Sequence, residues 1–281
     1  MIDLHTHSTC SDGSLTPTQL VDAAAAAGVS TLALTDHDST DGIAEFMAAC
    51  AKREIEGVPG VEMSADYSPG TLHMLGYFLD TGNPALQEVL GQIREGREDR
   101  NALILKKLTA LGMKLDWEKV AAKAGSDVVG RPHFAQAMVD AGIVATFKDA
   151  FDLYLGKGKP AYVDRYRLSP EAAIQLIRGA GGVAVLSHPF TLQLGQQELR
   201  QQVGRLRDQG LQGIEVYYSE HNREQTHEYE TLARDYGLLM TGGTDFHGTI
   251  NPDIKLGRGF GPLEVPDRLM DGIRRAAGNR K

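Results

Sequence analysis

Cysteine is scarce in this sequence: only Cys10 and Cys50 occur among its 281 residues. Two cysteines cannot build a disulfide framework, and such sparing use is typical of a reducing compartment. No stretch approaches the roughly 18 consecutive apolar residues that a membrane-spanning helix needs. The first residues include histidine and aspartate, which do not fit the apolar core of a signal peptide. We therefore expect a cytoplasmic protein without a membrane segment.

An excess of positive charge is also missing, since the formal net charge at pH 7 is −8. Long nucleic acids are usually held by a broad basic surface, which this composition does not favour. A small anionic substrate remains open, because a few local cations are enough to bind it. The sequence shows neither an internal repeat nor a low-complexity tract, and nothing in it implies a stable protein partner.

Apolar, strand-like runs alternate with helix-like segments through most of the chain. We expect strands at residues 1–5, 30–36, 56–65, 71–79, 183–189, 213–219 and 238–247. Helices are expected at residues 16–28, 39–53, 169–182, 196–210 and 223–237. The first of these helices has Thr16 as its N-cap and Gly28 as its stop signal. The alternation predicts parallel βα units, and about seven of them favour a barrel over a doubly wound sheet.

The middle of the chain differs, because it has helical periodicity and little strand signal. Four helices are expected there, at residues 84–112, 116–125, 131–142 and 146–158. An all-helical block within a βα series predicts an insertion. We therefore divide the chain into a barrel domain, residues 1–98 and 167–281, and a helical insertion, residues 99–166, that would cap the substrate.

The first strand carries two histidines with a spacing of two. Residues two apart in a strand point to the same side, so His5 and His7 are expected to project together, with Asp12 in the next loop. Two imidazoles and a carboxylate suit a divalent metal ion. An H-x-H pattern alone is a weak signal, because histidines often cap loops instead.

Further histidines and carboxylates recur after successive predicted strands. His37, Glu62, His73, His188, Asp245 and His247 each lie at or just beyond the expected carboxyl end of a strand. In a βα barrel that end is the face where catalytic groups gather. Six histidines and three carboxylates on one face require cations, because metal ions neutralise carboxylates and bind neutral imidazole. So many ligands favour about two or three clustered ions, which are typical of hydrolases that cleave phosphate esters.

The order of these motifs, H-T-H…D-G, T-D-H-D, G-x-E, H, S-H-P and D-F-H, resembles the polymerase and histidinol phosphatase (PHP) superfamily over nearly the whole chain. This resemblance implies an α/β fold, a distorted (β/α)7 barrel of PHP type with an all-helical insertion. The segments GRPHFAQAMVDAG, YLGKGKPAYV and AGGVAVLSHPF resemble the stand-alone members that include 3′,5′-nucleoside bisphosphate phosphatases and 5′→3′ exoribonucleases acting on short RNA.

The resemblance also implies a site for about three divalent ions per chain. Carried over by motif, one ion would take His5, His7, Glu62 and Asp245, a second Asp12, His37 and His247, and a third Glu62, His73 and His188, with Glu62 bridging. Relatives often have histidine where this chain has Asp12. The aspartate is a harder, anionic ligand, so we expect manganese, with magnesium, iron or zinc as alternatives.

Cationic and aromatic residues away from these motifs are candidates for substrate binding: Arg131, His133, Lys157, Lys159, Asn222, Arg223 and Phe190. Arginine binds phosphate with two parallel hydrogen bonds, and a helix N-terminus adds oriented N–H groups. A second cationic pocket would explain a substrate with two phosphates. Phe190 would stack on a base. The alternative interpretation of each cation is an ordinary side chain exposed to solvent.

The expected reaction removes the 3′-phosphate of a nucleoside 3′,5′-bisphosphate such as pAp, giving AMP and phosphate. Ions held by Asp245 and the other ligands would lower the pKa of the attacking water. The leaving oxygen needs a proton, for which His188, His221 and a water are the candidates.

Other functions remain open at this point. The nearest is 5′→3′ cleavage of short 5′-phosphorylated RNA, and a histidinol-phosphate-type phosphatase is a further alternative. Amidohydrolase barrels also open with H-x-H, but often carry a bridging modified lysine, for which no candidate is visible. A non-catalytic module with structural metals would favour cysteine ligands.

Overall fold

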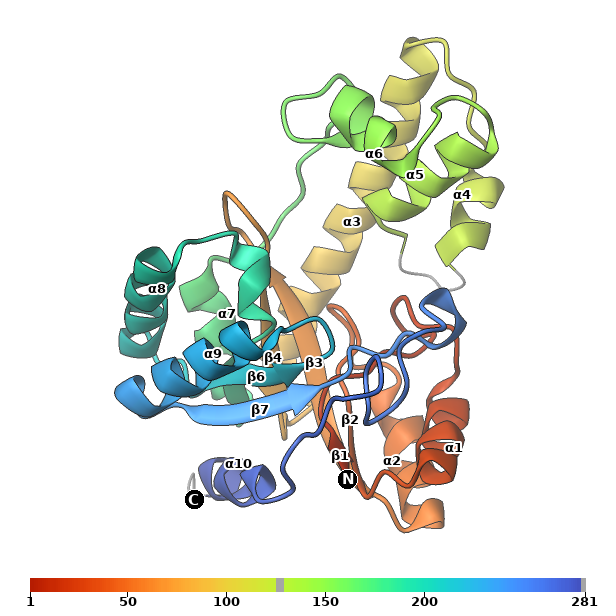
Figure 1. Cartoon of the computed structure of the whole chain (residues 1–281). Helices are drawn as coiled ribbons and strands as arrows, with labels where there is room; N and C mark the ends of the chain where they lie inside the picture. The colour runs from red at the N-terminus through yellow and green to blue at the C-terminus, as the bar shows by residue number, and fades with distance from the viewer. Residues whose placement is uncertain (125–128, 279–281) are drawn as a thin grey trace. The chain divides into compact units, whose positions relative to one another are not determined.

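The computed structural model describes residues 1–124 and 129–278 (Figure 1). The chain divides into two compact units. The first comprises Met1–Glu88 and Arg167–Lys281, and the second comprises Val89–Tyr166. The long helix α3 (Pro84–Ala110) contains both this division and the expected boundary at residue 99. No break in helical periodicity therefore marks the division in the sequence.

Within the described residues, seven strands of the first unit form one sheet in chain order. They are β1 (Ile2–Asp3), β2 (Thr31–Leu34), β3 (Glu56–Ala65), β4 (Leu72–Tyr77), β5 (Val183–Leu186), β6 (Gly213–Tyr218) and β7 (Leu239–Gly243). The neighbouring strands are parallel except at β4, which pairs antiparallel with both β3 and β5. This exception makes the (β/α)7 barrel a distorted one, because a short loop rather than a helix joins β3 to β4.

The barrel closes where its first strand meets its last. The amide of Leu4 donates to the carbonyl of Gly242 over 3.1 Å, and Thr6 pairs in parallel with Phe246 beyond the end of β7. The strand expected at residues 1–5 ends at Asp3, but the extended backbone continues through these bridges. Closure places the segment that follows β1 beside the segment that follows β7.

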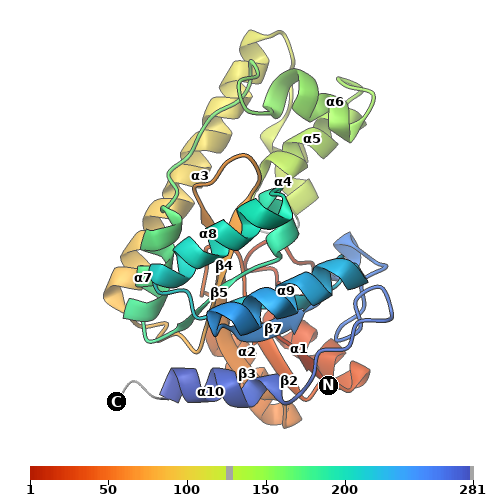
Figure 2. The same ribbon diagram turned by 60° about the vertical axis from the view of Figure 1, so that its left-hand side comes forward.

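Helices lie on the outside of the sheet in the first unit, as Figures 1 and 2 show. They are α1 (Pro17–Ala27), α2 (Ile43–Arg53), α7 (Pro170–Gly179), α8 (Gln196–Asp208), α9 (Arg223–Tyr236) and α10 (Leu269–Gly278), with short 3-10 helices η2 (Pro189–Leu192) and η3 (Gly248–Ile250). The sequence signals of α1 are confirmed: Thr16 is the N-cap and Gly28 ends the helix in the left-handed conformation. The helices cover the sheet through cores of buried hydrophobic side chains, among them Leu20, Leu34 and Phe46.

The regular elements of the second unit are all helices in its described part. It contains most of α3, then α4 (Trp117–Ala124), α5 (Arg131–Asp140), α6 (Phe147–Ala150) and a π-helical turn η1 (Phe151–Leu155). Ile104, Leu108, Val120, Phe134 and Met138 form its own buried core. The expected helices are confirmed, except that Gly125, the last residue of the second one, lies outside the described residues. No helix in the described ranges has the length and apolar character to cross a membrane.

Candidate metal centre

The histidine and carboxylate series converges within the first unit. Most of its members follow strands, as expected, but two do not. Glu62 lies within β3, and His73 is the second residue of β4, opposite Ser64. His73 reaches the same edge as the others because β4 runs antiparallel, so its amino end meets the carboxyl end of β3. The prediction that every member lies at or just beyond the carboxyl end of its strand was therefore wrong for His73 and inexact for Glu62, although both side chains are in the cluster.

Glu62 is the centre of the cluster and is completely buried. Its Oε1 lies 3.0 Å from Nδ1 of His73 and 3.0 Å from Nε2 of His188. Its Oε2 lies 3.0 Å from Nδ1 of His37 and 3.3 Å from Nε2 of His5. One carboxylate thus faces imidazoles from four different segments, which is the arrangement expected of a bridging ligand.

Five ligand atoms of the cluster are buried and, among the described residues, have no hydrogen-bond partner: His5 Nε2, His7 Nε2, His37 Nδ1, Glu62 Oε2 and Asp245 Oδ1. They nevertheless face one another closely, since Asp245 Oδ1 lies 3.0 Å from His7 Nε2 and 3.2 Å from His5 Nε2. A buried polar atom without a hydrogen bond lowers the free energy of unfolding. A divalent cation at their common focus satisfies the lone pairs of nitrogen and oxygen together, so the donor set fits a metal ion.

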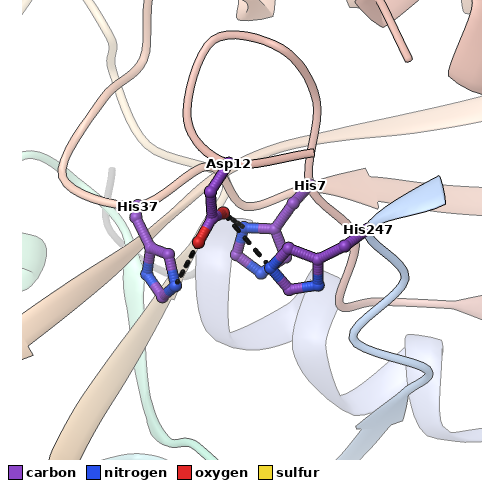
Figure 3. A group of neighbouring side chains, drawn as sticks. All are labelled: His7, Asp12, His37 and His247. Carbon is purple, nitrogen blue, oxygen red and sulfur yellow. Dashed lines mark ion pairs between the residues drawn. The ribbon is translucent and has the colours of Figure 1, made fainter. Parts of the chain in front are cut away.

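A second group surrounds Asp12 (Figure 3). His7, Asp12, His37 and His247 each offer a ligand atom, and these atoms lie within 4.8 Å of one another. Asp12 Oδ1 is 3.2 Å from Nε2 of His247, and Oδ2 is 3.7 Å from Nε2 of His37. The rings of His7 and His247 stack at a centroid distance of 4.2 Å on one side of the carboxylate, opposite His37.

The described residues contain two further groups with ligand atoms this close: His5, His7, Glu62 and Asp245, and His37, Glu62 and His73. The first has the same members as the set that the resemblance implies. The second lacks His188, which instead approaches Glu62 Oε1 directly. Each pair of groups has one residue in common. His7 links the Asp12 group to the Asp245 group, His37 links the Asp12 group to the His73 group, and Glu62 links the last two. Neighbouring ions would therefore share ligands.

Hydrogen bonds on the outer side of the rings fix which nitrogen faces the cluster. Nδ1 of His5 lies 3.0 Å from Oε1 of Glu215, and Nδ1 of His247 lies 2.8 Å from the carbonyl oxygen of Asp245. An ionised carboxylate or a carbonyl only accepts, so each Nδ1 carries the proton. Nε2 of both rings is thereby presented to the ligand groups.

His188 is held in a similar way by the loop after β5. Its Nδ1 lies 3.1 Å from Oγ1 of Thr191, whose hydroxyl is 3.0 Å from the carbonyl oxygen of Thr71. The backbone of His188 has φ 23° and ψ 71°, a combination that residues with side chains rarely adopt. Its amide donates to Oε2 of Glu215 over 2.8 Å, which helps to hold that conformation.

The loop that carries Asp12 is tied down by a buried aspartate. Asp36 accepts hydrogen bonds from the amide and hydroxyl of Ser8, each over 2.7 Å, and from the hydroxyl of Ser11. Ser11 Oγ also lies 3.4 Å from Nδ1 of His7. Asp36 therefore fixes both the turn before Asp12 and the outer side of His7.

Charge coupling sets the protonation of these groups. Burial alone would raise the pKa of Glu62, but the neighbouring His37 and His5 outweigh it and hold that pKa well below its usual value. The pKa of Asp12 is likewise held well below its usual range, because His37 and His247 outweigh the effect of burial. Burial lowers the pKa of His37 to about 4. Ionised carboxylates beside a neutral imidazole are the forms that bind metal.

An aromatic group borders the cluster. The hydroxyl of Tyr218 donates to Oδ2 of Asp245 over 2.8 Å, and the ring of Phe190 lies 6.3 Å from that of His188. Phe190 also meets His221 edge to face at 5.6 Å. The structure thus places Phe190 and His221 next to the proposed ligands.

His221 does not fit the role of proton donor. Its Nδ1 lies 2.8 Å from the carbonyl oxygen of Val216, so the ring proton is already donated there. Burial lowers the pKa of His221 to about 4, which leaves Nε2 unprotonated near neutral pH. The ring can therefore accept a proton or a hydrogen bond but has none to give.

The next two candidates on this loop open helix α9. Asn222 is its N-cap, and Oδ1 accepts from the amide of Gln225 over 2.9 Å. Arg223 is the first residue of the helix and is exposed. Asn222 thus has a structural task, whereas Arg223 has its side chain in solvent.

The remaining substrate candidates lie in the second unit. Arg131 begins α5, and its guanidinium lies 5.2 Å from the ring centroid of Tyr162. His133 caps the same helix, since its Nδ1 accepts from the amide of Gly130 over 2.9 Å. Lys157 and Lys159 are exposed in the turn after η1.

Sequence reasoning missed the outer residues Asp36, Thr191, Glu215 and Tyr218. Two of them could have been recognised from the sequence. Glu215 is a carboxylate in the apolar strand GIEVYY, and a buried carboxylate needs hydrogen-bond partners. Asp36, directly before His37, is a similar case. Thr191 and Tyr218 carry no comparable signal, since either residue type is ordinary in a loop or strand.

Comparison with known proteins agrees with this geometry. Residues 3–119 match the PHP domain. The chain is 40% identical over 247 residues to a 3′,5′-nucleoside bisphosphate phosphatase of Chromobacterium violaceum, covering 88% of this chain and 87% of that protein. It is 36% identical over 263 residues to the 5′-3′ exoribonuclease Rnm of Salmonella typhimurium, covering 91% of this chain and 88% of that protein.

Two solved structures share the fold over almost the whole chain. One is described as an amidohydrolase from Chromobacterium violaceum, with a TM-score of 0.83 and 37% identity over 100% of this chain and 99% of that one. The other, from Bifidobacterium adolescentis, is assigned as a metal-dependent phosphoesterase, with a TM-score of 0.82 and 29% identity over 98% and 95% of the two chains. The motifs, the barrel and these relatives together show that the chain belongs to the PHP domain family.

Proposed function

We propose that the chain is a metal-dependent phosphoesterase that removes the 3′-phosphate of nucleoside 3′,5′-bisphosphates, converting pAp to AMP and phosphate. The observation that carries this proposal is the set of buried, unpartnered ligand atoms that face one another around Glu62 and Asp245. The identity to a nucleoside bisphosphate phosphatase supports the choice of substrate.

The proposed ligands are those that the resemblance implies: His5, His7, Asp12, His37, Glu62, His73, His188, Asp245 and His247. We propose about three ions, with manganese as the resident metal because the carboxylates of Asp12, Glu62 and Asp245 are hard ligands. When bound, such ions lower the pKa of a water nucleophile, neutralise phosphate and stabilise the leaving oxygen.

The side chains of this site then have separate tasks. Glu62 keeps its carboxylate between imidazoles, and Tyr218 holds Oδ2 of Asp245 so that Oδ1 faces His5 and His7. His188 is oriented by Thr191 and acts as a ligand. The unprotonated Nε2 of His221 would accept a hydrogen bond from a substrate hydroxyl.

Candidate cations for recognition of the second phosphate are present in each unit separately. Arg131, with His133 at the start of α5 and Lys157 and Lys159 in a glycine-containing turn, offers donors for an anion. Arg223 of α9 is exposed and offers another, while Phe190 presents a ring for the base.

The free thiols of Cys10 and Cys50 suit the cytoplasm, which we propose as the location.

Phosphate release from pAp tests the proposal. Manganese-loaded protein should release phosphate and AMP in equal amounts, and Asp245→Asn should lower the rate by more than about 100-fold, because loss of a ligand exceeds the usual cost of losing an outer partner. The matched control is Asp253→Asn, which changes an exposed aspartate outside the site. Equal rates for wild type and Asp245→Asn would refute the assignment.

A second candidate activity is 5′→3′ cleavage of short RNA, favoured by the identity to the Rnm exoribonuclease. Both reactions break a phosphate ester at a 3′-oxygen beside a recognised 5′-phosphate. The kcat/KM for pAp and for short 5′-phosphorylated oligoribonucleotides, measured on the same preparation, decides between them. The same preparation should also be assayed with histidinol phosphate and with amide substrates. Amides are included because a similar structure is described as an amidohydrolase.

A further inference from the structure

Glu215 is a buried acid outside the proposed ligand set. It lies in β6 and is 0% exposed. Its Oε1 lies 3.0 Å from Nδ1 of His5, a residue 210 positions away in the sequence. Its Oε2 accepts from the amide of His188 over 2.8 Å and from the hydroxyl of Ser187 over 3.2 Å. The two oxygens therefore hold two segments that each carry a proposed ligand.

The bond to Oε1 decides how His5 faces the cluster. With its Nδ1 proton directed at Glu215, His5 turns Nε2 toward Glu62 Oε2 at 3.3 Å and Asp245 Oδ1 at 3.2 Å. That Nε2 is buried and lacks a hydrogen-bond partner among the described residues. A ring held in this way offers its lone pair without reorientation when a cation enters.

The bond to Oε2 acts on the backbone instead of a ring. His188 has a positive φ of 23°, and its amide would lose its partner if Glu215 were replaced by an apolar side chain. Thr191 orients the ring of His188, whereas Glu215 holds the backbone from which the ring projects. One carboxylate thus fixes His5 through its side chain and His188 through its main chain.

The charge of Glu215 separates it from the other outer partners. The Nδ1 partners of His247 and His188 are a carbonyl and a hydroxyl, both neutral. An anionic partner polarises the imidazole more strongly and makes the opposite nitrogen a better donor to metal. Of these three ligands, His5 is therefore the one whose strength depends most on its outer partner.

We propose that Glu215 is a positioning residue that fixes the ring of His5 and the backbone of His188 for metal binding, an inference that rests on the proposed role of those histidines as ligands. Glu215→Gln tests it. The amide can keep one contact, but its NH2 group then meets either the His188 amide or the His5 Nδ1 proton, and two donors repel.

Manganese affinity, measured against a competing chelator without any substrate, is the primary readout. Glu215→Gln should bind at least one ion about 10–100-fold more weakly than wild type. Saturating manganese should then restore hydrolysis of pAp, as a purely structural defect would not allow. The control is Tyr217→Phe, which removes a hydroxyl of the same strand that donates to Glu230 instead of the cluster.

Affinity within twofold of wild type in folded Glu215→Gln would overturn the proposal. Should that variant fail to fold, Glu215→Asp decides, because its shorter side chain cannot reach both His5 and His188: weaker manganese binding supports the proposal and unchanged binding refutes it. These titrations contain no nucleotide. A chain that binds manganese through His5 but leaves pAp intact would refute the proposed substrate alone.

Discussion

At the scale of single residues, Asp12 is the carboxylate in a group whose other members, His7, His37 and His247, are imidazoles. Its carboxylate lies between His37 on one side and the stacked rings of His7 and His247 on the other (Figure 3). An oxygen ligand with a negative charge favours hard ions, and a nitrogen ligand at the same position favours softer ones. We therefore expect the metal preference of the second group to depend on this side chain.

Asp12→His should shift the metal preference toward zinc. We expect the ratio of zinc to manganese affinity to rise by roughly tenfold or more, because a neutral nitrogen replaces an anionic oxygen. Competition titrations with both metals measure the ratio. Asp12→Asn is the control, since it keeps an oxygen but removes the charge and should weaken binding of both metals. An unchanged ratio in Asp12→His would show that other ligands set the preference.

The proposed ligands were predictable from the sequence because their residue types are rare together and recur at regular intervals. The partners that hold them were not, since a threonine such as Thr191 looks like any loop residue. His221 shows a different limit. Its position beside the site was foreseen, but its single ring proton is committed to Val216, and no sequence pattern reports which nitrogen of a histidine is occupied.

At the scale of elements, most helices and strands follow from local signals. Thr16, Pro17 and Gly28 delimit α1 because each satisfies a backbone requirement of a helix end. The direction of β4 could not be predicted, because an apolar strand has the same pattern in either direction. Its reversal depends on pairing with β3 through residues such as Met63 and Met74, which is a tertiary property.

The ion pair between Glu56 and Arg274 joins β3 to the terminal helix α10. Nε of Arg274 lies 2.8 Å from Oε1 of Glu56, and Nη2 binds Oε2, so the contact is bidentate. The hydrogen bonds from Arg274 lower the pKa of Glu56 below its ordinary value of 4.5. The native state therefore favours the ionised form more than the unfolded chain does.

Glu56→Gln should destabilise the protein by about 0.5–1 kcal/mol at pH 7, the upper part of the range for exposed pairs. A lowered pKa stabilises the native state above the pKa of the unfolded chain. The contribution is lost as the pH falls through the lower native value, so the difference from wild type should start to shrink near pH 4.5 and vanish below the lowered native pKa. Urea denaturation at several pH values measures it. Glu264→Gln, at an exposed glutamate near α10, is the control, and a difference that persists in acid would contradict this account.

At the scale of the whole molecule, the barrel and the metal centre depend on different forces. The barrel is held by buried aliphatic side chains such as Leu32, Val58 and Val185, which differ from the ligand groups in chemistry although they lie in the strands that lead to them. The ligand groups can also be neutralised by protons. Burial opposes the charged form of His247, but Asp12 and Asp245 outweigh it and raise the pKa of His247 to about 10.

Removal of metal should therefore leave the chain folded but inactive. For one ion present at 100 times its Kd, the lost binding energy is about 2.7 kcal/mol, or a fall in Tm of about 5–10 °C. Circular dichroism and thermal melts before and after chelation measure both effects, and added manganese should restore phosphate release. A chain that unfolds on chelation would instead favour structural metals.

Closure of the barrel between β1 and β7 also has a consequence for synthesis of the chain. His5 is synthesised 210 residues before Glu215, which orients it, and both His5 and His7 precede Asp245 and His247 in the chain. A nascent chain therefore exposes these imidazoles, with Asp12 and Glu62, long before Asp245 exists to complete the site. The full set of proposed ligands is present only after Asp245 and His247 have been synthesised, and a chain truncated before them would lack two of these ligands.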